Sequence, residues 1–150
     1  MSASPRGWEI RDAQEHDLGG VLALWEGAGS VRTPTDDEQS LRTLLAFDPE
    51  AVIVAELQGA LVGSVIVGWD GWRGSFYRLA VRPPERRHGL ATELVREGER
   101  RLQRRAAVRL NAIVVADERG AVRFWGAVGY AAHPEQLRFV RDLGDRAQDP

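Results

Sequence analysis

The middle of the chain contains a strand, a helix and a second strand in that order, and this succession limits the possible folds. The segment "SFYRLAV" (75–81) has strand-forming residues, and Pro83-Pro84 ends it because proline cannot donate to a β-ladder. Helical spacing of apolar residues then runs from 89 to about 105, and "LNAIVV" (110–115) follows as a short buried strand. A helical crossover between neighbouring strands makes them parallel, so the sheet must contain at least one parallel pair.

Other strands are expected to pair as hairpins. Two β-branched runs, 51–57 and 61–69, are separated by the turn residues Gln58-Gly59. A second turn led by Asp70-Gly71 connects 61–69 to the strand at 75–81. These connections predict antiparallel neighbours for most of the sheet.

Helices and short strands complete the pattern. Helical spacing is present in 16–29, in 35–47, where Thr35 and Glu38 form a capping-box pattern, and in 119–130. Short strands are expected at 8–10 and at 137–143, where apolar and polar residues alternate.

The order of elements predicts an α/β fold of the mixed α+β kind. It should have a mixed, mostly antiparallel sheet with one βαβ crossover and helices on both faces. There is no repeat or linker, so we expect a single domain over 1–150, with flexible tails at 1–7 and 144–150.

Composition excludes several chemistries. The 150 residues include no cysteine, and all 20 basic residues are arginine. Disulfides, thiolate metal sites, a cysteine nucleophile and lysine Schiff bases are therefore excluded, and no metal site is expected. No apolar run is long enough to span a membrane, and no signal-peptide core is present, which predicts a cytoplasmic protein that does not bind membranes.

The turn before the long helix concentrates positive charge. Arg86, Arg87 and His88 precede Gly89 and Ala91, and the stretch 82–109 holds nine arginines against four glutamates. The first amides of a helix have no internal partners and attract phosphate, and glycine lets a ligand approach the backbone. The Walker and dinucleotide motifs are both absent. The turn is either a pyrophosphate cradle or an ordinary basic turn that caps a helix.

Three segments carry a resemblance to a known family. "RRHGLA" (86–91) matches the signature [QR]-x-x-G-x-[GA] of the GCN5-related N-acetyltransferases, the GNAT family. "ERGAVRFWGAVGY" (118–130) resembles the family segment NxxAxxFYxxxGF, and "GWDGWRG" (68–74) resembles a hairpin of small bacterial members. The resemblance implies the GNAT fold and an enzyme that transfers acetyl from acetyl-CoA to a primary amine by direct attack in a ternary complex.

The resemblance also assigns residues that bind coenzyme A. The backbone of Leu79 and Val81 would pair with the pantetheine arm and stabilise the thioester oxyanion, which makes both residues catalytic candidates. The full set expected to bind the cofactor is Leu79, Ala80, Val81, Arg86, Arg87, His88, Gly89, Leu90, Ala91, Thr92, Glu118, Phe124 and Trp125.

Two departures from the family pattern affect the expected proton transfers. Glu118 replaces an asparagine, and Trp125 replaces a tyrosine that protonates the leaving thiolate in many members. Indole is not a useful acid, so the thiolate would leave unassisted or take a proton from water, with Tyr77 and Tyr130 as weaker candidates. No glutamate lies near Ser75, so a water chain polarised by Ser75 or by backbone carbonyls is the expected base.

The acceptor is expected between the first two helices and the turn at 69–73. Asp70 could attract an ammonium group there, or Arg32 could bind a carboxylate; alternatively, Asp70-Gly71 only closes a hairpin. Residues assigned to the acceptor site are Arg32, Trp69, Asp70, Trp72, Arg73 and Tyr77.

Two other functions were weighed against the enzyme. The first is a module that binds acyl-CoA and acts as a sensor without turnover. The second is a nucleic-acid binder that uses the arginine-rich helix, which is disfavoured because aromatics are not interleaved with the arginines and the net charge is −2. The expected partner is a small-molecule or peptide amine rather than a nucleic acid, and a homodimer is an open alternative.

Overall fold

The computed structural model describes residues 6–144, so most of each predicted terminal tail lies outside the described residues. Two compact units meet in sequence between Ala112 and Ile113, and each is described separately. The order of strands and α-helices is β1 (Glu9–Asp12), α1 (Leu18–Gly27), α2 (Glu38–Phe47), β2 (Val52–Leu57), β3 (Ala60–Trp69), β4 (Gly74–Val81), α3 (Leu90–Arg104), β5 (Leu110–Ala112) and α4 (Arg119–Ala127). None of the described helices is long and apolar enough to cross a membrane.

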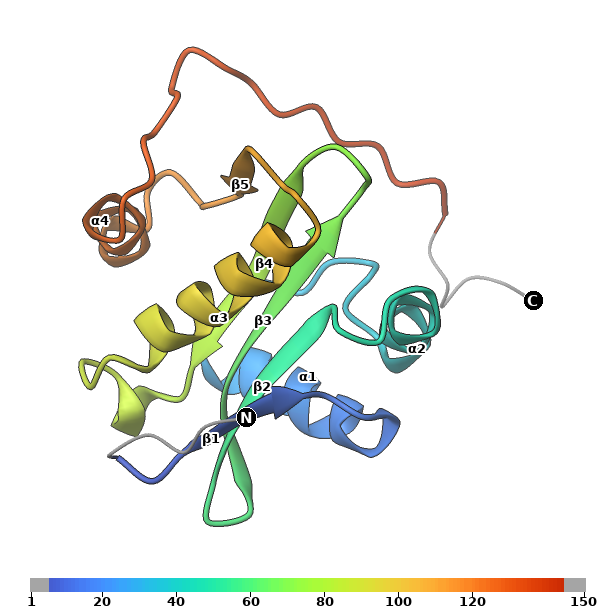
Figure 1. Ribbon diagram of the computed structural model, residues 1–150. Helices are drawn as coiled ribbons and strands as arrows, with labels where there is room; N and C mark the ends of the chain where they lie inside the picture. Colours follow the sequence, from blue (N-terminus) through green and yellow to red (C-terminus); the bar gives the residue numbers. More distant parts are fainter. Residues whose placement is uncertain (1–5, 145–150) are drawn as a thin grey trace. The chain divides into compact units, whose positions relative to one another are not determined.

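The first unit is built on one mixed sheet with the strand order β1-β2-β3-β4-β5. The first four strands are antiparallel to their neighbours, and β5 lies parallel to β4. Helix α3 covers one face, and α1 covers the other with α2 beside it (Figure 1). The predicted hairpins, the crossover and the helices on both faces are confirmed.

Helix α3 approaches the sheet closely because glycines lie in the interface. A Cβ atom built on Gly98 would overlap the ring of Phe76 and lie 2.9 Å from Cγ2 of Val67. A Cβ atom on Gly74 would lie 2.6 Å from Cδ1 of Leu102. This tight contact holds α3 against β3 and β4, so the start of the helix is fixed close to the end of β4.

The start of α2 differs from the sequence expectation. Asp37 is the N-cap residue, and its carboxylate accepts a hydrogen bond from the amide of Ser40 at 2.7 Å. The capping box predicted for Thr35 and Glu38 is wrong by two residues. Asp37 is itself a strong capping residue, so the local pattern offered two starts.

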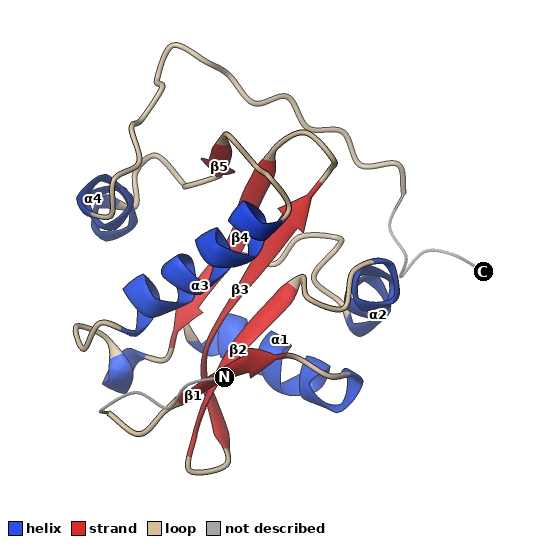
Figure 2. Cartoon of the chain, viewed as in Figure 1, coloured by secondary structure: helices blue, strands red, loops and turns tan. Residues whose placement is uncertain are grey.

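The second unit contains α4, which ends before Gly129 at a φ of 104° as predicted. The strand predicted at 137–143 is wrong, because this segment is a loop (Figure 2). Leu137, Phe139 and Val140 are largely exposed there. An alternating side-chain pattern stabilises a strand only when a neighbouring strand pairs with it. The strand predicted at 110–115 is also shorter than expected, because β5 ends at Ala112.

Candidate active site

One edge of β4 is open over half of its length. The parallel ladder with β5 joins only Gly74, Ser75 and Phe76 to partners. Among residues 6–144, no strand pairs with this edge of β4 from Tyr77 to Val81. Such an edge can accept an extended ligand through backbone hydrogen bonds, as an added strand would.

A β-bulge lies on this open segment. Ser64 of β3 is opposite Ala80 and Ile66 is opposite Tyr77, so Arg78 and Leu79 together face one residue of β3. Arg78 adopts a φ of 56°, which is unusual for a residue with a side chain. A bulge bends a strand and changes the direction of its backbone groups, and here it does so at Leu79.

The turn after β4 leads into a row of amides that precede the helical ladder of α3. The first backbone bond of α3 runs from Glu93 N to Gly89 O at 3.0 Å, so the amides of Leu90, Ala91 and Thr92 lie ahead of the helical ladder. Arg87 and Gly89 both have positive φ, at 67° and 88°, and a Cβ atom on Gly89 would meet nothing within 4 Å. Amides at a helix start that have no partner in the helical ladder form a site suited to phosphate.

Arg86 is turned toward the protein rather than toward this row of amides. Its Nε donates to Val81 O at 3.0 Å, and its Nη2 donates to Ala28 O at 3.3 Å. The guanidinium therefore ties the turn to the end of β4 and to the residue that follows α1. A phosphate contact by Arg86 would require it to leave these carbonyls.

The predicted acceptor residues do not gather in one place. The Asp70 carboxylate accepts hydrogen bonds from Arg73 N at 2.7 Å and Trp72 N at 2.8 Å, which lowers the pKa of Asp70. The Arg73 guanidinium lies 4.0 Å from the ring centroid of Trp72, and Trp69 ends β3 opposite Gly74. This turn precedes β4, five residues and about 15 Å along the strand from the bulge.

Arg32 lies nearer the bulge. It follows Val31, whose carbonyl accepts a hydrogen bond from Arg78 Nη2 at 3.0 Å, and the Arg32 side chain is exposed.

On β4 itself, Ser75 pairs with Gly68 on one side and Asn111 on the other. Tyr77 is half-exposed, at 42%. Arg78 was not among the predicted site residues, because its only sequence signal is its place among the alternating residues of β4.

Four predicted residues belong to the second unit. Glu118 occupies the N-cap position of α4, and Trp125 is 8% exposed. Its ring makes edge contacts with Phe124 at 5.5 Å and with Tyr130 at 4.9 Å between ring centroids. The three aromatic residues thus form one cluster, and their roles toward a ligand stay predictions.

Ion pairs engage Arg96, Arg100 and Arg104, which lie four residues apart along α3. Arg96 pairs with Glu99 at 2.8 Å, and Arg100 pairs with Glu97 at 3.0 Å. Arg104 lies 3.5 Å from Glu50. Nucleic-acid binding depends on free positive charge, so these pairs weigh against that interpretation.

Residues 20–130 match the model of the Acetyltransferase (GNAT) family. The chain belongs to this family. Acetyltransferase YE1169 of Yersinia enterocolitica is 38% identical over 122 residues, which cover 81% of this chain and 86% of the relative. This chain is an acetyl-CoA-dependent N-acetyltransferase, and acetyl-CoA is its co-substrate.

Solved structures share the GNAT fold at low identity. Ard1 from Thermoplasma volcanium has a TM-score of 0.74 and 18% identity, covering 83% of this chain and 82% of its own. PaiA N-acetyltransferase from Thermoplasma acidophilum, in complex with coenzyme A, has a TM-score of 0.74 and 13% identity, covering 85% and 91%. At these identities the likeness shows the fold alone.

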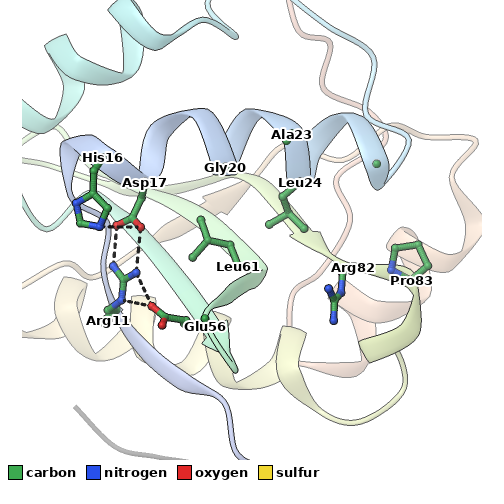
Figure 3. A pocket seen from close by; sticks show the side chains of 12 residues that line it. Arg11, His16, Asp17, Gly20, Ala23, Leu24, Glu56, Leu61, Arg82 and Pro83 are labelled. Carbon is green, nitrogen blue, oxygen red and sulfur yellow. Dashed lines mark hydrogen bonds and ion pairs between the residues drawn. The ribbon is translucent and has the colours of Figure 1, made fainter.

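A separate cavity of about 640 Å³ lies between α1 and the β2–β3 hairpin. Figure 3 shows Arg11 pointing at both Asp17 and Glu56, with ion-pair distances of 2.7 Å to each. The Arg11 guanidinium and the carboxylates of Asp17 and Glu56 thus satisfy one another. None of the predicted site residues lines this cavity. The lining residues are Arg11, His16, Asp17, Gly20, Ala23, Leu24, Gly27, Glu56, Gly59, Leu61, Arg82 and Pro83.

The Arg11–Asp17 pair predicts a pH dependence of stability. Hydrogen bonds from Arg11 and the Gln14 amide hold the pKa of Asp17 below its usual range, although burial opposes them. The unfolded chain therefore binds a proton first, at a pKa of about 3.9, so the contribution of Asp17 is present above that pH and is lost as pH falls further. Asp17→Asn should lower the free energy of unfolding at pH 7 by about 1.5–3 kcal/mol. Urea titrations from pH 7 to pH 3 check this, and the variant should show the shallower decline with pH. Parallel curves for the two proteins would contradict it.

Proposed function

We propose that the protein transfers the acetyl group of acetyl-CoA to a primary amine, which attacks the thioester directly in a ternary complex. The open β4 edge, which leads into the first amides of α3, carries this proposal. A pantetheine arm along Leu79, Ala80 and Val81 would lead to pyrophosphate bound by the amides of residues 87–92. The sequence has no cysteine that could carry the acetyl group, which supports direct attack.

Each step of the reaction can be given a group in this chain. The amine nitrogen attacks the thioester carbon, and backbone groups of Leu79 and Val81 stabilise the resulting oxyanion. The attacking nitrogen loses its proton to water held near Ser75, and the carbon–sulfur bond breaks. The departing thiolate has a low basicity, with a thiol pKa of about 8.5, so it can leave unassisted or take a proton from water, Tyr77 or Tyr130.

We also propose that both compact units form one GNAT domain. The family match runs from residue 20 to residue 130 and so spans the division at Ala112. The expected roles of Glu118, Phe124 and Trp125 toward the pantetheine and its thiol stay predictions from the family resemblance. A cytoplasmic location and a homodimer stay predictions from the sequence.

An amine screen tests the proposed function. Acetyl-CoA turnover is measured with four probes: spermidine, kanamycin, L-phenylalanine and the tetrapeptide Ala-Ala-Ala-Ala. Thiol release with formation of the acetylated amine supports the proposal. If CoA binds in calorimetry but no amine is acetylated, the acyl-CoA sensor interpretation replaces it.

Arg32 rather than Asp70 is expected to contact the acceptor. Arg32 is exposed beside the bulge, whereas the Asp70 carboxylate is held by two amides of its own turn. Arg32→Ala should raise the KM of a carboxylate-bearing amine such as L-phenylalanine about tenfold, because a charge-assisted hydrogen bond is lost. Asp70→Asn is the matched control and should keep the wild-type KM. Steady-state kinetics at saturating acetyl-CoA check both, and the reverse order of effects would assign the site to the hairpin turn.

A further inference from the structure

Arg78 fastens the α1–α2 connection to the bulge of β4. Its Nη2 donates to Val31 O at 3.0 Å and lies 3.5 Å from Thr33 Oγ1. The same guanidinium forms an ion pair with Asp36, whose side chain is nearly buried at 10% exposure. The two N–H groups of this nitrogen thus hold the segment 31–36 at Val31 and Asp36.

Hydrogen bonds within the segment 31–36 also hold its turn together. The Asp36 carboxylate accepts hydrogen bonds from Thr33 N at 2.7 Å and Thr33 Oγ1 at 3.1 Å, and Asp36 N donates to Thr33 O at 3.0 Å. Asp37 then caps α2. Holding Asp36 therefore holds the whole turn and the start of the helix.

The Arg78 guanidinium lies over a buried residue whose polar group is already hydrogen-bonded. The Arg78 guanidinium lies 5.7 Å from the ring centroid of Trp25. The indole of Trp25 donates to Ser64 Oγ at 2.9 Å, and Ser64 is the β3 partner of Ala80. The bulge, the segment 31–36 and the β3–β4 ladder are thereby joined in one set of contacts.

The bulge conformation itself does not require arginine. A φ of 56° is adopted more readily by glycine, and a side chain there costs about 1–2 kcal/mol. The contacts of the Arg78 side chain offset that cost. The presence of arginine at position 78 is therefore better explained by the contacts of its guanidinium than by the backbone conformation at that position.

We propose that Arg78 is a positioning residue that holds the segment 31–36 as one wall of the acceptor entrance. Val31 and Arg32 are exposed on that segment beside the bulge. The proposal rests on the proposed function, in which the acceptor attacks a thioester held along Leu79–Val81. Because the Arg78 guanidinium is engaged with the segment 31–36, its loss should affect acceptor binding and leave CoA binding unchanged.

Two variants separate the side chain from the backbone. Arg78→Gly keeps a residue suited to positive φ and removes the guanidinium, and Asp36→Asn removes the charge of its partner. Each should raise the KM of the best amine of the four-probe screen about tenfold while kcat changes less than twofold. The dissociation constant of CoA in calorimetry should stay within twofold of the wild-type value.

Two further measurements make the test independent of turnover. The Arg78→Gly/Asp36→Asn double variant should be no worse than either single variant, because both remove one interaction. The amides of Thr33 and Asp36, which are hydrogen-bonded within the segment, should lose hydrogen-exchange protection in Arg78→Gly, whereas amides of α3 should not. An unchanged acceptor KM, or unchanged protection at Thr33 and Asp36, overturns the proposal. If no probe is acetylated by the wild type, the proposed function fails, and the exchange measurement alone decides whether Arg78 holds the segment.

Discussion

Gly89→Val is expected to weaken CoA binding about 100-fold, which corresponds to about 2.8 kcal/mol. Gly89 has a φ of 88°, a conformation that β-branched residues rarely adopt, and its Cβ position faces open space. The new side chain would strain the turn and enter the space beside the first amides of α3, where the proposed pyrophosphate lies. Calorimetry with CoA measures the loss.

Gly71→Val is the matched control for this variant. Gly71 has a φ of 90°, and a Cβ atom there also meets nothing within 4 Å, but it lies in the β3–β4 turn. The backbone strain is therefore similar, and CoA affinity should stay at the wild-type value. A folded Gly89→Val protein with normal affinity, or an equal loss in Gly71→Val, would place the phosphate site elsewhere.

Gly98→Val is expected to have the largest effect on stability. Gly98 lies in the middle of α3, where a Cβ atom would overlap the buried ring of Phe76. Overpacking usually costs about 1–3 kcal/mol, and a branched side chain in this contact should reach at least the upper end. The melting temperature should fall by about 6–12 °C, as measured by thermal circular dichroism.

The matched control is Gly27→Ala at the end of α1. A Cβ atom on Gly27 meets nothing within 4 Å, so alanine should preserve or raise stability by up to about 1 kcal/mol through its helix propensity. If Gly98→Val melts at the wild-type temperature, α3 does not pack on Phe76 as closely as the structure has it.

Much of the fold was predictable because local signals were strong. Prolines after β4, glycine at the start of α3 and β-branched runs around Gln58-Gly59 each have one dominant structural meaning. The prediction of a strand at 137–143 was wrong because an alternating side-chain pattern does not show that a partner strand is present. No local signal tells how far β5 extends, and that length decides whether further strands can be added.

The site was only partly predictable for a similar reason. The row of amides at Gly89 follows from a helix start, which sequence can locate. The contact of Gly98 with Phe76 and the ion pair of Arg78 with Asp36 join residues 22 and 42 positions apart, and neither pair has a sequence signature. In the sequence Asp36 is one of three consecutive acidic residues, 36–38, and its partner Arg78 lies on a distant strand.

The open edge of β4 also concerns how the protein behaves when coenzyme A is scarce. Unpaired strand edges are templates on which other chains can assemble, and that risk ends when a ligand covers them. A bulge makes such an edge a poor template, because it interrupts the regular spacing of donors and acceptors. The bulge at Arg78 and Leu79 is therefore expected to protect the ligand-free protein against aggregation. It lies at the strand position where acetyl transfer is proposed to occur.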